Sequence, residues 1–406
     1  MSTRQTAHPW QFKARFRRHA FGWRSQPAIT RVKEAVSEIR KVSRTDTLLA
    51  AEGAVLFLEK VSPALEQVDS SSGAIGTAVN HAIDVLVKIV AEAPADDSTR
   101  EAWLERLFQA HADDGIPYIE LLADYWGELC ASPEVASRWA DQLIDITRRV
   151  LSPQSPPGHH FHGATACLSA LYAAGRYDEL LELAQGARLW HYRQWAAKAL
   201  IARGKRAEAL RYAEDCRNPW ANDLAIDRLC EEALLSSGFA EDAYRRYGLT
   251  ANRAGTYLAW FRAVAKKYPH KEKAEILADL VRLTPGEEGK WFAAAKDAGM
   301  LDEAIALANA NPCAPQTLTR AARDYAEKNP AFAIEAGMAA LRWLVKGYGY
   351  EITGFDVVAA YTHTMKAAEH AGRADETFGR IRELVSEDRS PGGFVTQMLG
   401  RRLELT

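Results

Sequence analysis

Basic and aromatic side chains alternate near the start of the chain, and this combination of residue types can bind an anion or a nucleic acid. Arginine pairs with phosphate or carboxylate groups, and aromatic rings stack on bases or anchor protein interfaces. Residues 1–33 contain eight lysines and arginines and no acid, whereas the rest of the chain has 43 basic and 53 acidic residues. The sequence therefore predicts a basic arm on an acidic body. The arm has six candidate partner-binding residues: Trp10, Phe12, Arg15, Arg17, Arg18 and Trp23.

Three interpretations of this arm stay open. On a helix Phe12 and Phe16 share one face, so the aromatic rings would dock on the body as an N-terminal cap while the arginines face water. Alternatively, the arginines contact nucleic-acid phosphates and the rings stack on bases. A third interpretation is that the arm meets an acidic protein partner or an anionic membrane surface.

A second candidate binding stretch lies in the middle of the chain. It combines aromatic and basic residues on a predicted helix, at Trp190, His191, Tyr192 and Arg193. Such residues anchor interfaces when they face a partner, and they form the core when they pack between repeats. A weaker basic cluster surrounds Pro269, at Lys266, Lys267, His270, Lys271 and Lys273.

Metal and cofactor chemistry is not expected. His159, His160 and His162 are close in sequence, but no neighbouring cysteine or acid completes a ligand set, so we expect solvent-exposed histidines and no bound metal. The five cysteines are far apart, which favours buried thiols in a reducing cytoplasm over disulfides. They are Cys130, Cys167, Cys216, Cys230 and Cys313.

The sequence contains none of the motifs that usually mark an active site or a nucleotide loop, so we expect a protein that is not an enzyme. The most apolar stretch, residues 83–90, is interrupted by Asp84 and Lys88, which argues against a membrane-spanning helix. No export signal is evident at the N-terminus. These features predict a cytoplasmic protein without a membrane span.

Five copies of one short turn separate the predicted helices that carry these residues. Each copy begins with a glycine, which can adopt the left-handed conformation that ends a helix. One or two acids three to four residues later would cap the next helix and meet the positive end of its dipole. The five turns begin at Gly175, Gly204, Gly238, Gly299 and Gly372.

The spacing of these turns predicts repeated helical hairpins. The glycines are 29, 34, 61 and 73 residues apart, so the last two gaps are about twice a period in the thirties. Small residues follow three of the turns, at Ala209, Ala243 and Ala304, and would let the paired helices approach closely. No alternating strand pattern appears. We therefore predict an all-α fold, an α-solenoid of stacked antiparallel helical hairpins.

One of these units resembles the tetratricopeptide repeat. The stretch LSALYAAGRYDELLELA, residues 168–184, has Gly175, Tyr177, Asp178 and Glu179 where that family has them. The resemblance implies a TPR-like solenoid, with a more HEAT-like N-terminal end. The whole chain also resembles a bacterial family of helical-repeat proteins without an assigned function. That likeness is carried by FKARFRRHAFGW, VDSSSGAIG, WHYRQW, TPGEEGKWFAAAKDAG and GYGYEIT.

These patterns divide the chain into four parts. We expect a basic-aromatic arm at 1–28, a helical-repeat region at 29–150, a Pro/Gly/His linker at 151–163 and a TPR-like solenoid at 164–406. The favoured function is a non-catalytic scaffold that binds a protein partner through a solenoid surface. The alternatives are a nucleic-acid-binding repeat protein that uses the arm, and an accessory or regulatory subunit of an enzyme complex.

Overall fold

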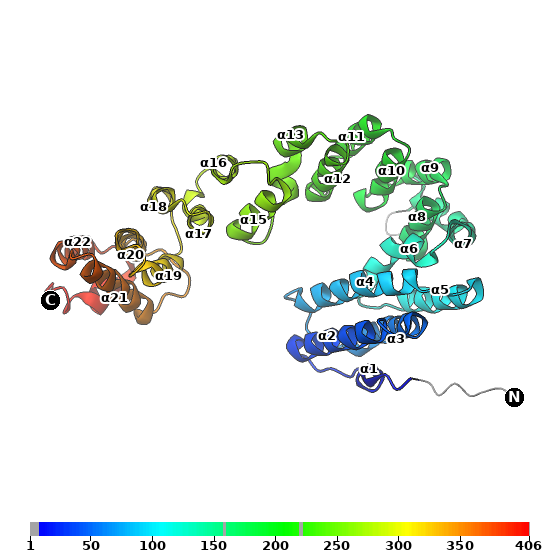
Figure 1. Cartoon of the computed structure of the whole chain (residues 1–406), viewed down its shortest axis with the longest axis horizontal. Helices are drawn as coiled ribbons and strands as arrows, with labels where there is room; N and C mark the ends of the chain where they lie inside the picture. Colours follow the sequence, from blue (N-terminus) through cyan, green and yellow to red (C-terminus); the bar gives the residue numbers. More distant parts are fainter. Residues whose placement is uncertain (1–7, 157–159, 219–221, 406) are drawn as a thin grey trace. The chain divides into compact units, whose positions relative to one another are not determined.

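The structure is a computed structural model that describes residues 8–156, 160–218 and 222–405 (Figure 1). Within these ranges the regular secondary structure is entirely helical, so the predicted all-α class is confirmed. The chain forms two compact units, Met1–Leu229 and Cys230–Thr406, called unit 1 and unit 2 below. The boundary falls within helix α12 (Asp223–Leu235).

Unit 1 is built from helices that pack against their neighbours in sequence. Helix α3 is central, because α2, α4 and α5 all pack on it, and α6 then joins α4 to α8. The elements are α1 (Gln11–Arg15), α2 (Ser25–Val42), α3 (Thr47–Leu65), α4 (Ala74–Glu92), α5 (Asp97–Ala112), η1 (Glu120–Tyr125), α6 (Trp126–Cys130), α7 (Pro133–Leu151), α8 (Gly163–Ala173), α9 (Tyr177–Gly186), α10 (Trp190–Ala202) and α11 (Arg206–Asp215).

Unit 2 continues the same style of neighbour packing, and its most closely packed helices are α19, α20 and α21. Its elements after α12 are α13 (Ala240–Ala243), η2 (Tyr244–Gly248), α14 (Leu249–Ala251), α15 (Tyr257–Lys267), α16 (Lys273–Leu283), η3 (Glu288–Trp291), α17 (Phe292–Asp297), α18 (Leu301–Ala310), α19 (Pro315–Tyr325), α20 (Pro330–Val345), α21 (Gly354–His370), α22 (Ala374–Ser386), η4 (Pro391–Gly393) and α23 (Phe394–Leu399).

All five predicted glycine turns have the backbone that their sequence requires. The glycines have φ between 66° and 81°, in the left-handed region. In each turn the residue after the glycine donates its N–H to a carbonyl five residues earlier, which is the Schellman arrangement. The five bonds are Arg176 to Leu171, Lys205 to Leu200, Phe239 to Leu234, Met300 to Ala295 and Arg373 to Ala368, at 2.8–3.0 Å.

The acids that follow these glycines do not cap the next helix with their side chains, which corrects one expectation from the sequence. The residue at each helix start makes no side-chain capping bond. Instead, two acids pair with the arginine directly before the helix, Glu179 with Arg176 at 2.6 Å and Glu376 with Arg373 at 2.6 Å. The acids still lie in the first turn, where the helix dipole favours negative charge.

Helix α4 alone among the described helices is long and apolar enough to cross a membrane by length and composition. Its apolar side chains are buried inside unit 1, where α4 packs against α2, α3 and α6. They include Ile75, Val79, Ile83, Leu86 and Val90. The helix therefore reads as a core helix, and the structure gives no clear membrane span.

The expected linker, residues 151–163, lies within unit 1, and its described part contacts helices on both sides. Helices α7 and α8 pack directly against each other across it. The His162 carbonyl lies 3.1 Å from Nε2 of His111, near the end of α5, so this nitrogen carries the proton and donates to the carbonyl. His159 lies outside the described residues.

Buried His111 makes the stability of the protein depend on pH. Burial lowers the pKa of His111 below 6.5, and its Nδ1 is buried without a hydrogen-bond partner in the described structure. Below pH 6.5 His111 is therefore mostly protonated in the unfolded chain and still neutral in the folded chain. The free energy of unfolding should thus fall as pH decreases from about 7 toward the pKa of His111 in the folded protein. Denaturant unfolding at several pH values measures this loss.

The control is His111→Gln, which should flatten this dependence because glutamine does not titrate. Burial raises the pKa of neighbouring Asp114 despite hydrogen bonds from Ser62 and Ile119, so Asp114 acts in the opposite direction. Asp114 is present in both proteins, and the difference between them isolates His111. An equal pH dependence in wild type and variant would show that His111 is not the responsible group.

Candidate anion-binding groove

Helix α2 carries opposite charges on different sides. Lys33, Arg40 and Arg44 recur at intervals that place them along one side of the helix, with Arg44 in the turn just beyond its end. Glu34 and Glu38, four residues apart, occupy another side. All five side chains are at least partly exposed, because the apolar residues of α2 take the side that faces the core. The sequence of one helix thus separates a basic stripe from an acidic one.

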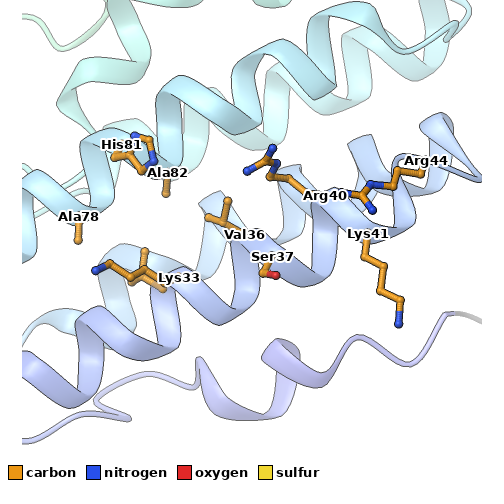
Figure 2. Close-up of a pocket in the computed structure, with 10 residues that line it drawn as sticks. Lys33, Val36, Ser37, Arg40, Lys41, Arg44, Ala78, His81 and Ala82 are labelled. Carbon is orange, nitrogen blue, oxygen red and sulfur yellow. The ribbon is translucent and has the colours of Figure 1, made fainter.

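The basic stripe faces a hollow of about 490 Å³ between α2 and α4. Figure 2 shows Val36 and Arg40 extending toward α4, and Ala78 and Ala82 extending from α4 toward α2, with His81 beside them on α4. Ala78 and Lys33 lie toward one end of the hollow and Arg44 toward the other (Figure 2). We call this hollow the α2–α4 groove. It is lined by Val32, Lys33, Val36, Ser37, Arg40, Lys41, Arg44, Ala78, His81 and Ala82.

The charges of the α2–α4 groove are not neutralised within the described chain. Five lining residues are basic and none is acidic. None of the five makes an ion pair with a described residue, although 30 such pairs occur elsewhere in these ranges. Lys41 lies at the edge of the groove, between the basic stripe and the two acids of α2, and it extends away from α4 (Figure 2).

The N-terminal arm explains why the acids of α2 leave the groove unbalanced. The Glu38 carboxylate accepts hydrogen bonds from the backbone N–H groups of Gln11, at 2.8 Å, and Phe12, at 3.2 Å, and so caps α1. Glu34 pairs with Arg15 at 2.8 Å and with Arg31 at 2.6 Å. Figure 1 shows α1 beside α2 and α3. The arm therefore occupies the acids on one side of α2, and the basic stripe on the other side stays uncompensated.

A hollow of similar size in unit 2 has a different electrostatic character. It contains residues of both signs, and they pair with one another. Lys271 lies 2.8 Å from Glu241 and 2.9 Å from Glu275, and Arg282 lies 2.9 Å from Asp279. The basic cluster predicted around Pro269 has acidic partners of the same kind. Lys271, described above, belongs to this cluster, and His270 lies 3.1 Å from Glu241. Local ion pairs thus satisfy most of this cluster.

The aromatic residues of the arm divide into a buried group and one exposed member. Trp10, Phe12 and Phe16 are buried against α3, where the rings of Phe12 and Phe16 meet the Phe57 ring edge-on. Trp23 is 72% exposed. The two predicted binding residues Trp10 and Phe12 therefore form part of the core, whereas Trp23 stays accessible to a partner.

The predicted arginines of the arm also differ in their environments. Arg15 pairs with Glu34, and Arg18 lies 3.4 Å from Glu66, which also approaches His19 at 3.2 Å. Arg17 is exposed and makes no ion pair with a described residue. Both pairs are exposed to solvent, so they weaken with salt and leave the arginines partly accessible.

The docking of the arm can be tested at Gly53, in the middle of α3. A Cβ atom there would lie 2.3 Å from the Trp10 ring, so Gly53→Ala should force Trp10 out of its site. In an open helix this substitution stabilises by up to about 1 kcal/mol. Here overpacking should reverse the sign and lower the free energy of unfolding by about 1–3 kcal/mol.

Two measurements check this expectation: chemical denaturation and the rate of tryptic cleavage at Lys13 and Arg15. The control is Gly22→Ala, because no atom lies within 4 Å of the added Cβ. Faster cleavage and lower stability in the Gly53 variant alone would support a docked arm. An increase in stability would show that Trp10 does not occupy the space over Gly53.

The second predicted binding stretch, at the start of α10, contributes mainly to packing. Trp190 and Tyr192 are buried. His191 is exposed, and its Nε2 lies 2.8 Å from the Thr165 hydroxyl. Arg193 is partly buried, with its guanidinium 5.1 Å from the centre of the Tyr212 ring. These four residues therefore do not converge on one open surface.

In the described ranges, no group of three or more histidines, cysteines or acids is placed so that it could hold a metal ion. His160 is exposed, and its ring lies 4.7 Å from the ring of His162. The five cysteines are buried free thiols, as their sequence positions predicted.

The basic groove was not predicted from the sequence, although the spacing of its α2 residues is visible there. The spacing of Lys33, Ser37, Arg40 and Arg44 marks one side of a helix. The contribution of α4 could not be predicted, because His81 joins the groove only through the packing of α2 on α4.

Comparisons with known proteins assign no family and no function to the chain. No protein-family model matches the chain, and no curated protein matches it. The function proposed below therefore rests on the residues and contacts described above.

Proposed function

We propose that the protein binds the phosphate backbone of a nucleic acid in the α2–α4 groove. The observation that carries this proposal is the row of basic side chains from Lys33 through Arg40 to Arg44, none of which pairs with an acid in the described part of the chain. Lysine and arginine next to phosphates release condensed counterions, which is the main source of sequence-independent affinity for nucleic acids. A groove without acids offers this gain without a competing repulsion.

The shape of the basic surface favours an extended anion. Lys33 and Arg44 are eleven residues apart, so the stripe extends about 16 Å along the helix axis. A single small anion would use one end of such a stripe and leave the other charges unpaired. A polymer with a charge on every unit can pair with all of them, and guanidinium groups suit the geometry of phosphate oxygens.

The second candidate is the protein-binding scaffold that the sequence favours. Its support is the apolar floor of the groove, formed by Val32, Val36, Ala78 and Ala82, which would take apolar side chains of an acidic peptide. We prefer nucleic acid, because the charged residues at the groove are more exposed than this floor, where Val32 and Ala82 are buried.

The architecture we propose is a solenoid of TPR-like helical hairpins. Its support is the five Schellman turns and the packing of successive helices within each unit. In this proposal the protein has no catalytic activity of its own, acts in the cytoplasm, and serves as a binding module or as an accessory subunit. Bacterial origin stays an inference from the sequence resemblance.

The direct test is a titration of the full-length protein with labelled RNA and DNA over a series of salt concentrations. We expect the logarithm of the binding constant to fall linearly with the logarithm of the salt concentration. Polyglutamate is the competitor that represents an acidic protein segment. Stronger displacement by polyglutamate than by nucleic acid would favour the protein partner, and no nucleic-acid binding at low salt would refute the proposal.

A further inference from the structure

We infer that the nucleic acid in the α2–α4 groove is single-stranded and that one of its bases stacks on Trp23. This inference rests on the proposed function and specifies its substrate class. It is carried by an exposed tryptophan that precedes α2 by two residues, beyond one end of a basic groove whose lining contains no phenylalanine, tyrosine or tryptophan.

Trp23 lies close to the starts of α2 and α4, beyond the end of the groove that Lys33 and Ala78 line. It precedes the first residue of α2, Ser25, by two positions, and its carbonyl accepts the N–H of Asp69 at 2.9 Å, five residues before α4. Lys33 and Ala78 are the groove residues closest to these two helix starts. Since a helix rises 1.5 Å per residue, Ser25 and Lys33 are about 12 Å apart along α2.

The backbone around Trp23 is fixed on both sides. His19 donates its N–H to the Pro63 carbonyl at 3.0 Å, and the Phe21 ring meets the buried Phe16 ring edge-on at 5.3 Å. On the other side, α2 starts directly after Arg24. The fold therefore holds the backbone of Trp23 at a defined place with its ring exposed, which lowers the cost of ordering the protein when a base stacks there.

The charges around Trp23 suit a strand that continues toward the groove. Arg24 and Arg17 are exposed and make no ion pair with a described residue. Asp69, which contacts the Trp23 backbone, accepts the N–H of Ser71 with its carboxylate at 2.9 Å. Arg24, next to Trp23 in sequence, would be the first basic side chain to pair with a phosphate of the bound strand.

A single strand uses both features and a duplex uses only one. Single-stranded nucleic acids expose unstacked bases, which proteins bind on aromatic side chains, while a basic groove follows the backbone. In a duplex the bases are paired and stacked, so Trp23 has no base face to contact. The groove residues would still attract the duplex backbone through charge alone.

The test compares oligouridylate and oligothymidylate of about 12 nucleotides with a duplex of the same length, bound by the full chain. The variants are Trp23→Ala and Trp23→Phe, and the matched control is Tyr350→Ala, which removes another exposed ring. We expect Trp23→Ala to weaken single-strand binding about 10-fold or more and duplex binding very little. Trp23→Phe should restore most of the loss. Quenching of tryptophan fluorescence on binding should decrease in both Trp23 variants.

The outcomes separate this inference from the proposed function. Equal single-strand affinity in Trp23→Ala and wild type, with loss of affinity in a variant lacking the groove charges, overturns the stacking inference and leaves the groove in place. A duplex bound as tightly as the single strands overturns it in the same way. Failure of the wild type to bind any of the three nucleic acids refutes the proposed function itself.

Discussion

A chain that carries Lys33→Gln, Arg40→Gln and Arg44→Gln is expected to bind nucleic acid about 10²-fold more weakly than wild type at moderate salt. These three side chains form the basic stripe on one side of α2. Each contributes about one phosphate contact, so the slope of log affinity against log salt should become less steep by about 2 to 3. Fluorescence anisotropy over a salt series measures both quantities.

The charge-matched control places the same three neutralisations in unit 2, at Lys328, Arg401 and Arg402, which are exposed and make no ion pair with a described residue. This control changes the net charge equally, so it should leave affinity close to that of wild type if the groove is the binding site. Equal losses in both proteins would mean that net charge alone attracts the nucleic acid. No loss in the groove variant would exclude the groove.

The substitution expected to reduce stability most is Arg100→Met, in α5. Arg100 is only 4% exposed, and its guanidinium donates to the carbonyls of Val90, Ala91 and Ala93, with Leu129 at 3.5 Å. Methionine fills a similar volume but donates no hydrogen bond. We therefore expect the free energy of unfolding to fall by about 3–5 kcal/mol, because the carbonyls of Val90, Ala91 and Ala93 lose their charged hydrogen-bond donor.

The position of these carbonyls explains the size of the effect. Val90 and Ala91 lie in the last turn of α4, whose carbonyls lack the usual partner four residues later, and α4 ends at an extended Ala93 without a glycine cap. Two of the three carbonyls also accept a backbone N–H, that of Val90 from Ala93 at 3.4 Å and that of Ala93 from Ala95 at 2.8 Å. The guanidinium takes the place of that cap, and its positive charge meets the negative end of the helix dipole. Arg100 has no acidic partner here, so the carbonyls account for its burial in the described structure.

Thermal and urea unfolding, followed by tryptophan fluorescence and circular dichroism, measure this loss. A decrease of about 10 °C in the midpoint is expected for unit 1. Arg100→Lys should give an intermediate value, because one ammonium group cannot reach all of these carbonyls. Arg138→Met serves as the control, since Arg138 makes only exposed ion pairs with Asp97 and Glu101. A stability of Arg100→Met within 1 kcal/mol of wild type would show that the carbonyls find other donors.

The sequence by itself determined the helical class and the places where helices end. Gly175, Gly204, Gly238, Gly299 and Gly372 all adopt the left-handed conformation in the structure. This could be predicted because a Schellman turn depends on about six consecutive residues and on one glycine, without help from distant parts of the chain. Ala209, Ala243 and Ala304, close to their turns, were expected to let the paired helices approach closely, and all three are fully buried.

Only the tertiary structure decided which basic residues stay available for a partner. Residues 1–33, which include the arm, contain eight basic residues and no acid. Even so, Glu34, nineteen residues beyond Arg15, neutralises that arginine. Lys33, one residue before Glu34, lines the groove on another side of α2 and makes no ion pair with a described residue. His81 completes the groove from α4, 41 positions beyond Arg40. Charge pairing and concavity depend on contacts between distant segments, and the spacing of residues along one helix does not encode them.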